Sequence, residues 1–248
     1  MKRAAIKIAV RICGIATPCM VTGQSWAFDL TIDTGQRGTG PIELAALLTL
    51  ITLAPAILIM LTSFTRIVIV LSLLRQALGL QQTPPNMVIS GLAMFLTVLV
   101  MAPTWQRIQA SALEPYMAGQ MAPEAAVQTA EVPLRDFMLR QTRPADLAMA
   151  RQLMVKNNSI VTEPDARQLP FYALVPAFIS SELTSAFRVG FLIYLPFLVI
   201  DLVTSAVLMA LGMFMLPPAM ISIPLKLLIF TLASGWPLLL GNLAASFA

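Results

Sequence analysis

The amino-acid sequence predicts an all-α membrane protein of two proline-broken helical hairpins, with about four membrane spans and an external helical insert. Composition is the first observation behind this prediction: of 248 residues, 58% are hydrophobic and 11% are charged. Soluble domains are about 45–50% apolar and about 25% charged. The second observation is that residues 44–65, 76–106, 202–225 and 227–248 contain no charged side chain. A membrane span needs ~20 mostly apolar residues, and backbone in lipid becomes helical to satisfy its own hydrogen bonds.

Residues 1–27 are typical of a cleavable signal peptide. A basic start is followed by a short apolar run at 12–21 and by small residues at Ser25 and Ala27. We predict cleavage after Ala27, because the apolar run is far shorter than the ~20 residues of a span; the alternative is an uncleaved first membrane helix. The remaining chain has 12 basic and 12 acidic residues, so the net charge of +4 belongs to the signal and does not indicate a nucleic-acid partner.

Four apolar helices are expected, near 42–62, 87–105, 189–214 and 219–241. The connection at 63–86 carries Arg66 and Arg75 but no acidic residue, which by the positive-inside rule places it in the cytoplasm. Residues 106–170 then form an external, periplasmic insert, in which Pro133 and Pro144 bracket a helix. The predicted organisation is a signal at 1–27, a first hairpin region at 28–105, the insert at 106–170 and a second hairpin region at 171–248.

A weak internal repeat appears when the chain is offset by 133 residues, since six of the eleven residues at 77–87 are identical to those at 210–220. The matches include two proline pairs, Pro84-Pro85 and Pro217-Pro218. Proline cannot continue a helix but tolerates its first turn. We therefore expect a helix to end at an Ala-Leu-Gly and to restart after the prolines in both copies. Repeated broken helices are also typical of secondary transporters, which is one alternative function.

Charged residues interrupt the apolar second half of the chain at Glu182, Arg188, Asp201 and Lys226. A charge at the bilayer centre costs about 3 kcal/mol on insertion scales, so such side chains usually pair. Asp201 and Lys226 each stand in an otherwise uncharged stretch, and we predict that they pair. Three interpretations stay open: a structural ion pair, a proton or ion relay of a transporter, or a segment that does not cross lipid.

The residue types present exclude several kinds of chemistry. The chain has no histidine, and its cysteines, Cys13 and Cys19, both lie in the predicted signal. Thiolate and imidazole metal sites are therefore not expected, nor are Ser-His or Cys-His nucleophiles. No glycine-rich phosphate loop of the Walker kind is present, so any energy that transport requires must come from elsewhere. We expect neither a cofactor nor an enzymatic activity. Aspartate-based proteolysis within the membrane stays open, since it requires neither histidine nor cysteine.

Methionine is abundant, with 15 residues, and it gathers at the second helix break. Methionine usually fills irregular gaps in a core. The run Met213-Phe214-Met215 instead lies beside a bend, where side chains project from the end of a helix. Repeated around an oligomer axis, these side chains would form a deformable apolar constriction. Both interpretations stay open from composition.

Several long stretches match the pattern of a known family. They are Pro176-Ala177-Phe178-Ile179-Ser180-Ser181-Glu182-Leu183 and residues 186–191, 196–202, 209–213, 216–218, 224–228 and 235–236, preceded by 60–70, 75–79, 84–86 and 137–142. By these residues the chain resembles the FliP family of flagellar export-gate proteins, over nearly all of the sequence after the signal. A virulence injectisome counterpart of the same gate is the closest alternative.

The resemblance implies a pore-forming core subunit of the flagellar type III protein export gate in the bacterial inner membrane. Members of the family assemble as a homo-oligomer, expected to be a pentamer, with FliQ and FliR. They work with FlhA and FlhB and pass unfolded flagellar polypeptides. Much of the mature chain is then expected on the periplasmic side, in the flagellar basal body.

The resemblance also assigns roles to individual residues. Met213, Phe214 and Met215 correspond to the pore gasket, in which the family usually has methionine at the middle position. Glu182, Asp201 and Lys226 correspond to charged positions needed for assembly and export. Phe137 and Arg143 correspond to a region of subunit contact, and Pro84, Pro85, Pro217 and Pro218 mark the helix breaks.

Overall fold

A computed structural model describes residues 48–49, 52–53, 56, 59–156 and 169–247. The chain divides into two compact units, Met1–Ala54 and Pro55–Ala248, and every helix named below belongs to the second unit. The predicted signal peptide at 1–27 lies outside the described residues. Much of the apolar segment predicted at 42–62 also lies outside them.

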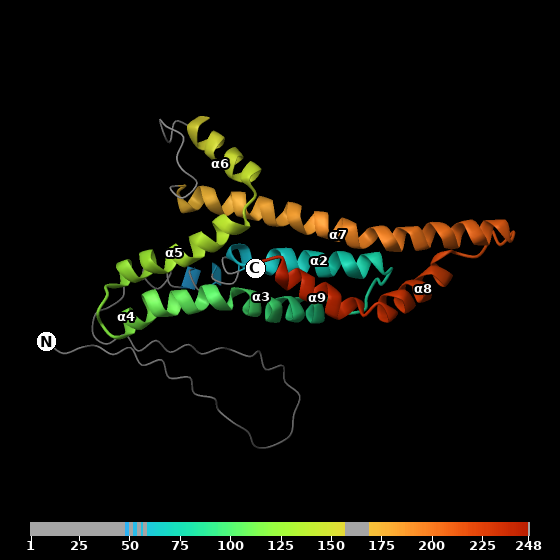
Figure 1. The fold of residues 1–248 in the computed structure, drawn as a ribbon, viewed down its shortest axis with the longest axis horizontal. Helices are drawn as coiled ribbons and strands as arrows, with labels where there is room; N and C mark the ends of the chain where they lie inside the picture. Colours follow the sequence, from blue (N-terminus) through green and yellow to red (C-terminus); the bar gives the residue numbers. More distant parts are fainter. Residues whose placement is uncertain (1–47, 50–51, 54–55, 57–58, 157–168, 248) are drawn as a thin grey trace, which may run out of the picture. The chain divides into compact units, whose positions relative to one another are not determined.

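The described part of the chain contains helices and no strand, which confirms the all-α expectation. The helices follow the sequence from the α2 to the α9 label in Figure 1. They are α2 (Phe64–Ala77), α3 (Asn86–Ile108), the π-helical turn η1 (Gln109–Leu113), α4 (Glu114–Met117), α5 (Pro123–Gln141), α6 (Pro144–Lys156), α7 (Phe171–Ala210), α8 (Ala219–Leu232) and α9 (Gly235–Ala245).

Two helical segments are long and apolar enough to cross a membrane, Asn86–Met117 and Phe171–Ala210. The pair α8 and α9 adds a third if it counts as one broken span, since it is bent by 65°. Among the described residues the number of candidate spans is therefore two or three. The prediction of a helix at 189–214 placed its start too late, because α7 begins at Phe171 and continues through Pro176 and Pro196.

The single helix predicted at 219–241 is wrong, because the chain breaks between α8 and α9. Ser234 has a left-handed backbone, with φ of 52°, and Pro237 has no N–H to continue the helical hydrogen bonds. Gly235 follows the break in a confined space, where an added Cβ would lie 2.2 Å from Cε2 of the Phe230 ring. The break thus requires a residue without a side chain.

Two further predictions about helix boundaries are corrected by the structure. The connection expected at 63–86 is largely helix α2, and Arg66 is buried rather than exposed in a loop. The helix expected between Pro133 and Pro144 instead begins at Pro123 and ends at Gln141, with Pro133 buried inside it. Proline is well tolerated at the first position of a helix, which is where Pro123 and Pro144 stand.

The main core forms where α2, α5 and α6 pack against α7. Phe137 of α5 and Phe178 of α7 meet edge to face, with ring centroids 6.0 Å apart. The α2–α7 contact is close because Gly190 has no side chain: an added Cβ would lie 2.2 Å from Cδ1 of Leu73 and 3.1 Å from its Cβ. The buried apolar residues of this core are Ile67, Val70, Leu71, Ile89, Ala93, Phe137, Met138, Leu147, Met154, Leu169, Leu174, Phe178, Ala186, Leu243 and Phe247.

The repeat is visible in the backbone at both helix breaks. Helix α2 ends at Ala77 and α7 at Ala210, and the following Gly79 and Gly212 have φ of 76° and 73°. The hydrogen bonds agree as well, since the N–H of Leu80 donates to Arg75 O at 3.1 Å and that of Met213 to Leu208 O at 3.0 Å. This is the Schellman type of helix end, in which glycine takes the left-handed position.

The two copies differ after this shared turn. The backbone of Pro85 is extended, with ψ of 151°, whereas Pro218 has ψ of −30°. The second helix of each copy therefore leaves its proline pair in a different direction. The repeat preserves how a helix ends and not the angle of the hairpin.

Candidate functional site: buried ion pairs and an exposed apolar turn

The turn between α7 and α8 presents its apolar side chains outward. Phe214 is 79% exposed and Met215 is 98% exposed, and Met213 is also exposed. Core filling, one of the two interpretations of this methionine cluster, is therefore wrong for these three residues within the chain. Large exposed apolar side chains on a turn require either another subunit or lipid to cover them.

Lys226 of α8 joins the two halves of the repeat. Its Nζ lies 2.7 Å from Asp201 Oδ2 and donates to the carbonyl oxygen of Ala77 at 3.1 Å. The lysine is 3% exposed, whereas the Asp201 side chain is about one-third exposed. The predicted pairing of Asp201 with Lys226 is thus present. The Ala77 carbonyl, at the end of α2, is a partner that a sequence pattern cannot reveal, because every residue carries one.

Glu182 has a partner that the sequence analysis missed. It is fully buried, and its two carboxylate oxygens accept hydrogen bonds from Arg66 Nε at 2.9 Å and Nη2 at 2.5 Å. This bidentate arrangement is the strongest geometry for a carboxylate and a guanidinium. The available signal was weaker than the one that identified Lys226, because Arg66 follows the uncharged stretch 44–65 but is followed by Arg75 after only eight residues.

Further groups complete the surroundings of Arg66. Its Nη2 donates to Gln141 Oε1 at 3.3 Å, and its Nη1 donates to Ser246 Oγ at 3.3 Å. The guanidinium carbon lies 4.0 Å from the centre of the Phe247 ring, which is within cation–π range. Gln141 Nε2 in turn donates to the carbonyl oxygen of Phe247 at 3.1 Å. Arg66 therefore connects α2, α5, α7 and the segment after α9.

The corner between α5 and α6 is held on the same turn of α7. The backbone N–H of Arg143 donates to Ser181 Oγ at 2.9 Å, and Ser180 Oγ donates to Asp146 Oδ1 at 3.2 Å. Arg143 Nε donates to the other oxygen of Asp146 at 2.8 Å. Ser180, Ser181 and Glu182 are consecutive in sequence, and each contacts a different part of the chain.

The two residues assigned to subunit contact have different environments. Phe137 is buried in the core at 3% exposure, so its side chain has almost no surface for direct contact with another subunit. The Arg143 side chain is about two-fifths exposed and is available to a partner. Arg188 is exposed on α7 and forms no ion pair within the part of the chain that the structure describes.

Metal binding finds no support in the described residues, where no group of three or more histidine, cysteine, aspartate or glutamate side chains gathers. The charged groups of the site instead neutralise one another in pairs. The arrangement is suited to holding helices together.

Exchanging the charges of Asp201 and Lys226 provides a test of their pairing. Each single change, Asp201→Lys or Lys226→Asp, places like charges together and is expected to abolish assembly of the protein into its complex. The double exchange is expected to recover assembly in part, because Lys226→Asp directs a carboxylate at the Ala77 carbonyl, another acceptor. Native gel electrophoresis of solubilised membranes measures the assembled fraction. A double exchange no better than either single one contradicts the pairing.

Comparisons with known proteins agree with the resemblance described above. A model of the FliP family matches residues 47–243. The flagellar biosynthetic protein FliP of Pectobacterium carotovorum subsp. carotovorum is 50% identical over 213 residues, covering 86% of this chain and 81% of the relative. Proteins of the same name from Caulobacter vibrioides and Bacillus subtilis are each 46% identical, over 250 and 207 residues. These matches cover 100% of this chain and 92% of the first relative, and 83% of this chain and 91% of the second. The chain belongs to the FliP family.

Proposed function

We propose that the chain is a pore-forming core subunit of the flagellar type III protein export gate. Its activity is passage of unfolded flagellar polypeptides across the bacterial inner membrane, and it catalyses no reaction itself. Family membership and the names of the relatives support this role. The observation that carries the mechanism is the exposed apolar turn at Met213, Phe214 and Met215.

The apolar turn has the chemistry of a seal. Thioether and aromatic side chains are deformable or flat, carry no charge and adapt to varied surfaces. A ring of such turns, one from each subunit, would exclude water and ions when empty and would yield to a passing polypeptide. Phe214 stands where the family usually has methionine. Its apolar aromatic ring can seal the pore in the same way.

Other exposed surfaces support an assembly of several subunits. Helix α7 has 40 residues and is therefore ~60 Å long, about twice the ~30 Å of a hydrocarbon core. Its exposed side chains include Phe187, Phe191, Leu202 and Val207. Lipid cannot cover the whole of so long a helix, so neighbouring subunits cover part of it. We propose a homopentamer with FliQ and FliR, next to FlhA and FlhB, with much of the mature chain on the periplasmic side.

A secondary transporter using Asp201 and Lys226 is less well supported. A relay requires its charged groups to open onto a cavity that solute or ions can enter. Neither the pocket beside Trp236 nor the pocket beside Asn242 is lined by Asp201 or Lys226. Two of the three N–H donors of Lys226 are also taken by its carboxylate and carbonyl partners.

Replacing Met213, Phe214 and Met215 together by alanine tests the seal. The variant is expected to let ions leak through the membrane, because the smaller side chains leave the constriction open. The matched control replaces Leu80, Gln81 and Gln82 by alanine, since these residues occupy the equivalent turn of the repeat. Conductance of the reconstituted complex measures the leak. An unchanged conductance in the gasket variant, or an equal leak in the control, contradicts the proposal.

Loss of the gene tests the wider role. A deletion strain is expected to lack hooks and filaments and to secrete other proteins normally, and the wild-type gene on a plasmid restores swimming. Normal swimming of the deletion strain contradicts a flagellar role. Restoration of swimming by the chain also distinguishes the flagellar gate from an injectisome counterpart.

A further inference from the structure

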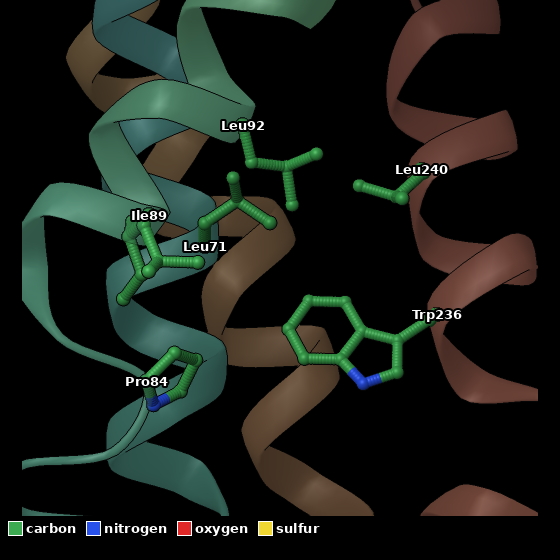
Figure 2. A pocket seen from close by; sticks show the side chains of 7 residues that line it. Leu71, Pro84, Ile89, Leu92, Trp236 and Leu240 are labelled. Atoms are coloured by element: carbon green, nitrogen blue, oxygen red, sulfur yellow. The ribbon is translucent and has the colours of Figure 1, made fainter.

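An apolar pocket lies where α3 and α9 meet the end of α2. It has a volume of about 260 Å³ and is lined by Leu71, Pro84, Val88, Ile89, Leu92, Trp236 and Leu240. Figure 2 shows side chains of α2 and α3 facing those of α9, which lies far from them in the sequence. An apolar cavity of ~150 Å³ already accommodates a benzene molecule. This pocket is therefore large enough for a longer hydrocarbon segment.

One end of the pocket adjoins a guanidinium that lacks an acidic partner. Arg75 Nη1 donates to the carbonyl oxygen of Pro84 at 3.2 Å and to Asn86 Oδ1 at 2.6 Å, and both acceptors are neutral. Among the residues that the structure describes, no carboxylate lies within ion-pair distance of Arg75. Arg66, Arg135 and Arg143 each have such a carboxylate. No described acidic side chain therefore compensates the positive charge at this end of the pocket.

The lining of the pocket is apolar throughout, and Arg75 lies beside the end that Pro84 forms. Pro84 and Trp236 lie at one end in Figure 2, and Leu92 and Leu240 lie at the other. Trp236 is exposed, at 39%, and tryptophan is enriched where membrane proteins cross the boundary between lipid and water. Helix α3 begins at Asn86, at the same end, and belongs to a segment long enough to span a membrane. The Arg75 end thus corresponds to the headgroup level, and the pocket extends from there toward the hydrocarbon.

We propose that this pocket is a binding site for an anionic phospholipid. The lipid phosphate contacts Arg75, whose Nε and Nη2 donate no hydrogen bond to any described residue, and one acyl chain fills the space between α3 and α9. Basic pockets between membrane helices bind anionic headgroups by this combination of charge and apolar surface. A zwitterionic lipid is expected to bind more weakly, because its own cationic group competes with Arg75 for the phosphate. The inference requires the chain to lie in a membrane but does not depend on protein export.

Tryptophan quenching by brominated lipids tests the site directly. Trp26 and Trp105 are replaced by phenylalanine in the full chain, which leaves Trp236 as the reporter inside the pocket. The protein is reconstituted in equimolar phosphatidylglycerol and phosphatidylcholine, with bromine on the acyl chains of one lipid at a time. We expect bromine on phosphatidylglycerol to quench more strongly, consistent with an enrichment of about five-fold over the bulk lipid for one arginine. Equal quenching by the two lipids overturns the proposal.

Variants of Arg75 identify the source of the preference. Arg75→Gln is expected to equalise quenching by the two lipids, and Arg75→Lys to retain most of the preference. The matched control is Arg107→Gln near the far end of α3, where the arginine Nε contacts the carbonyl oxygen of Pro103. A preference that survives Arg75→Gln, or that is lost equally in Arg107→Gln, overturns the assignment to Arg75. The comparison of the two lipids uses the protein with Arg75 and Arg107 unchanged, so it remains valid even if an arginine variant does not fold.

Discussion

Replacing Arg66 by alanine is expected to destabilise the folded protein by about 3–5 kcal/mol, the cost of leaving a buried charge without its partner. Glu182 would remain fully buried, with both oxygens deprived of their donors. The same change removes the cation facing the Phe247 ring and the donor to Gln141. The loss therefore extends over four parts of the chain and exceeds that of a surface ion pair.

A double variant distinguishes the cost of an unpaired buried charge from the cost of removing the volume of the arginine side chain. The double variant Arg66→Met/Glu182→Met removes both charges and keeps similar volumes, so it is expected to regain most of the lost stability. Arg140→Ala is the control, because Arg140 is an exposed arginine on α5. Unfolding of the detergent-solubilised protein, followed by circular dichroism, measures the midpoint for each variant. A double variant no more stable than Arg66→Ala would show that the pair itself is not the cause.

Gly190→Val is expected to be the second damaging change, with a cost of about 1–3 kcal/mol from overpacking. The branched side chain would enter space occupied by Leu73, whose Cδ1, Cβ and Cγ lie 2.2, 3.1 and 3.2 Å from the position of an added Cβ. Valine would therefore force α2 away from α7 at the closest point of their contact. Retention of the Arg66–Glu182 pair requires those helices to remain together.

A size exchange and a matched glycine test this explanation. Leu73→Ala combined with Gly190→Val is expected to recover part of the stability, because the valine then occupies the space that the leucine leaves. Gly91→Val on α3 is the control, since nothing lies within 4 Å of an added Cβ there. The unfolding midpoint in detergent is the measurement. Equal losses for Gly91→Val and Gly190→Val would indicate that valine disfavours these helices by itself.

The fold class and one ion pair could be predicted because their signals are local and uncommon. Uncharged stretches of more than twenty residues require helices, and Asp201 and Lys226 each stand alone within such stretches. The helix ends at Ala77 and Ala210 were predictable for a similar reason, since glycine and paired prolines restrict the backbone directly. The lone charges and the glycine and proline residues are informative because their effect depends on the residue itself and little on residues distant in the sequence.

The remaining features depend on tertiary contacts that a sequence pattern does not contain. Arg66 was assigned to a cytoplasmic loop because a basic residue beside an apolar stretch usually lies there. Its burial follows from Glu182, which lies 116 residues away. Pro133 was expected to begin a helix, but burial of its ring keeps it inside α5. Ser234 was missed because a left-handed serine has no sequence signature.

The three consecutive residues Ser180, Ser181 and Glu182 also constrain the order in which the protein forms. Chains are synthesised from the N-terminus, so α2, α5 and α6 leave the ribosome before α7 does. Until then, Arg66 lacks its carboxylate and Asp146 lacks the hydroxyl of Ser180. Earlier helices that enter the bilayer must wait there with incomplete polar contacts. Synthesis of α7 thus supplies the carboxylate of Arg66 and the hydroxyl for Asp146 at one point, and the contacts of Arg66 with Ser246 and Phe247 follow only at the end of the chain.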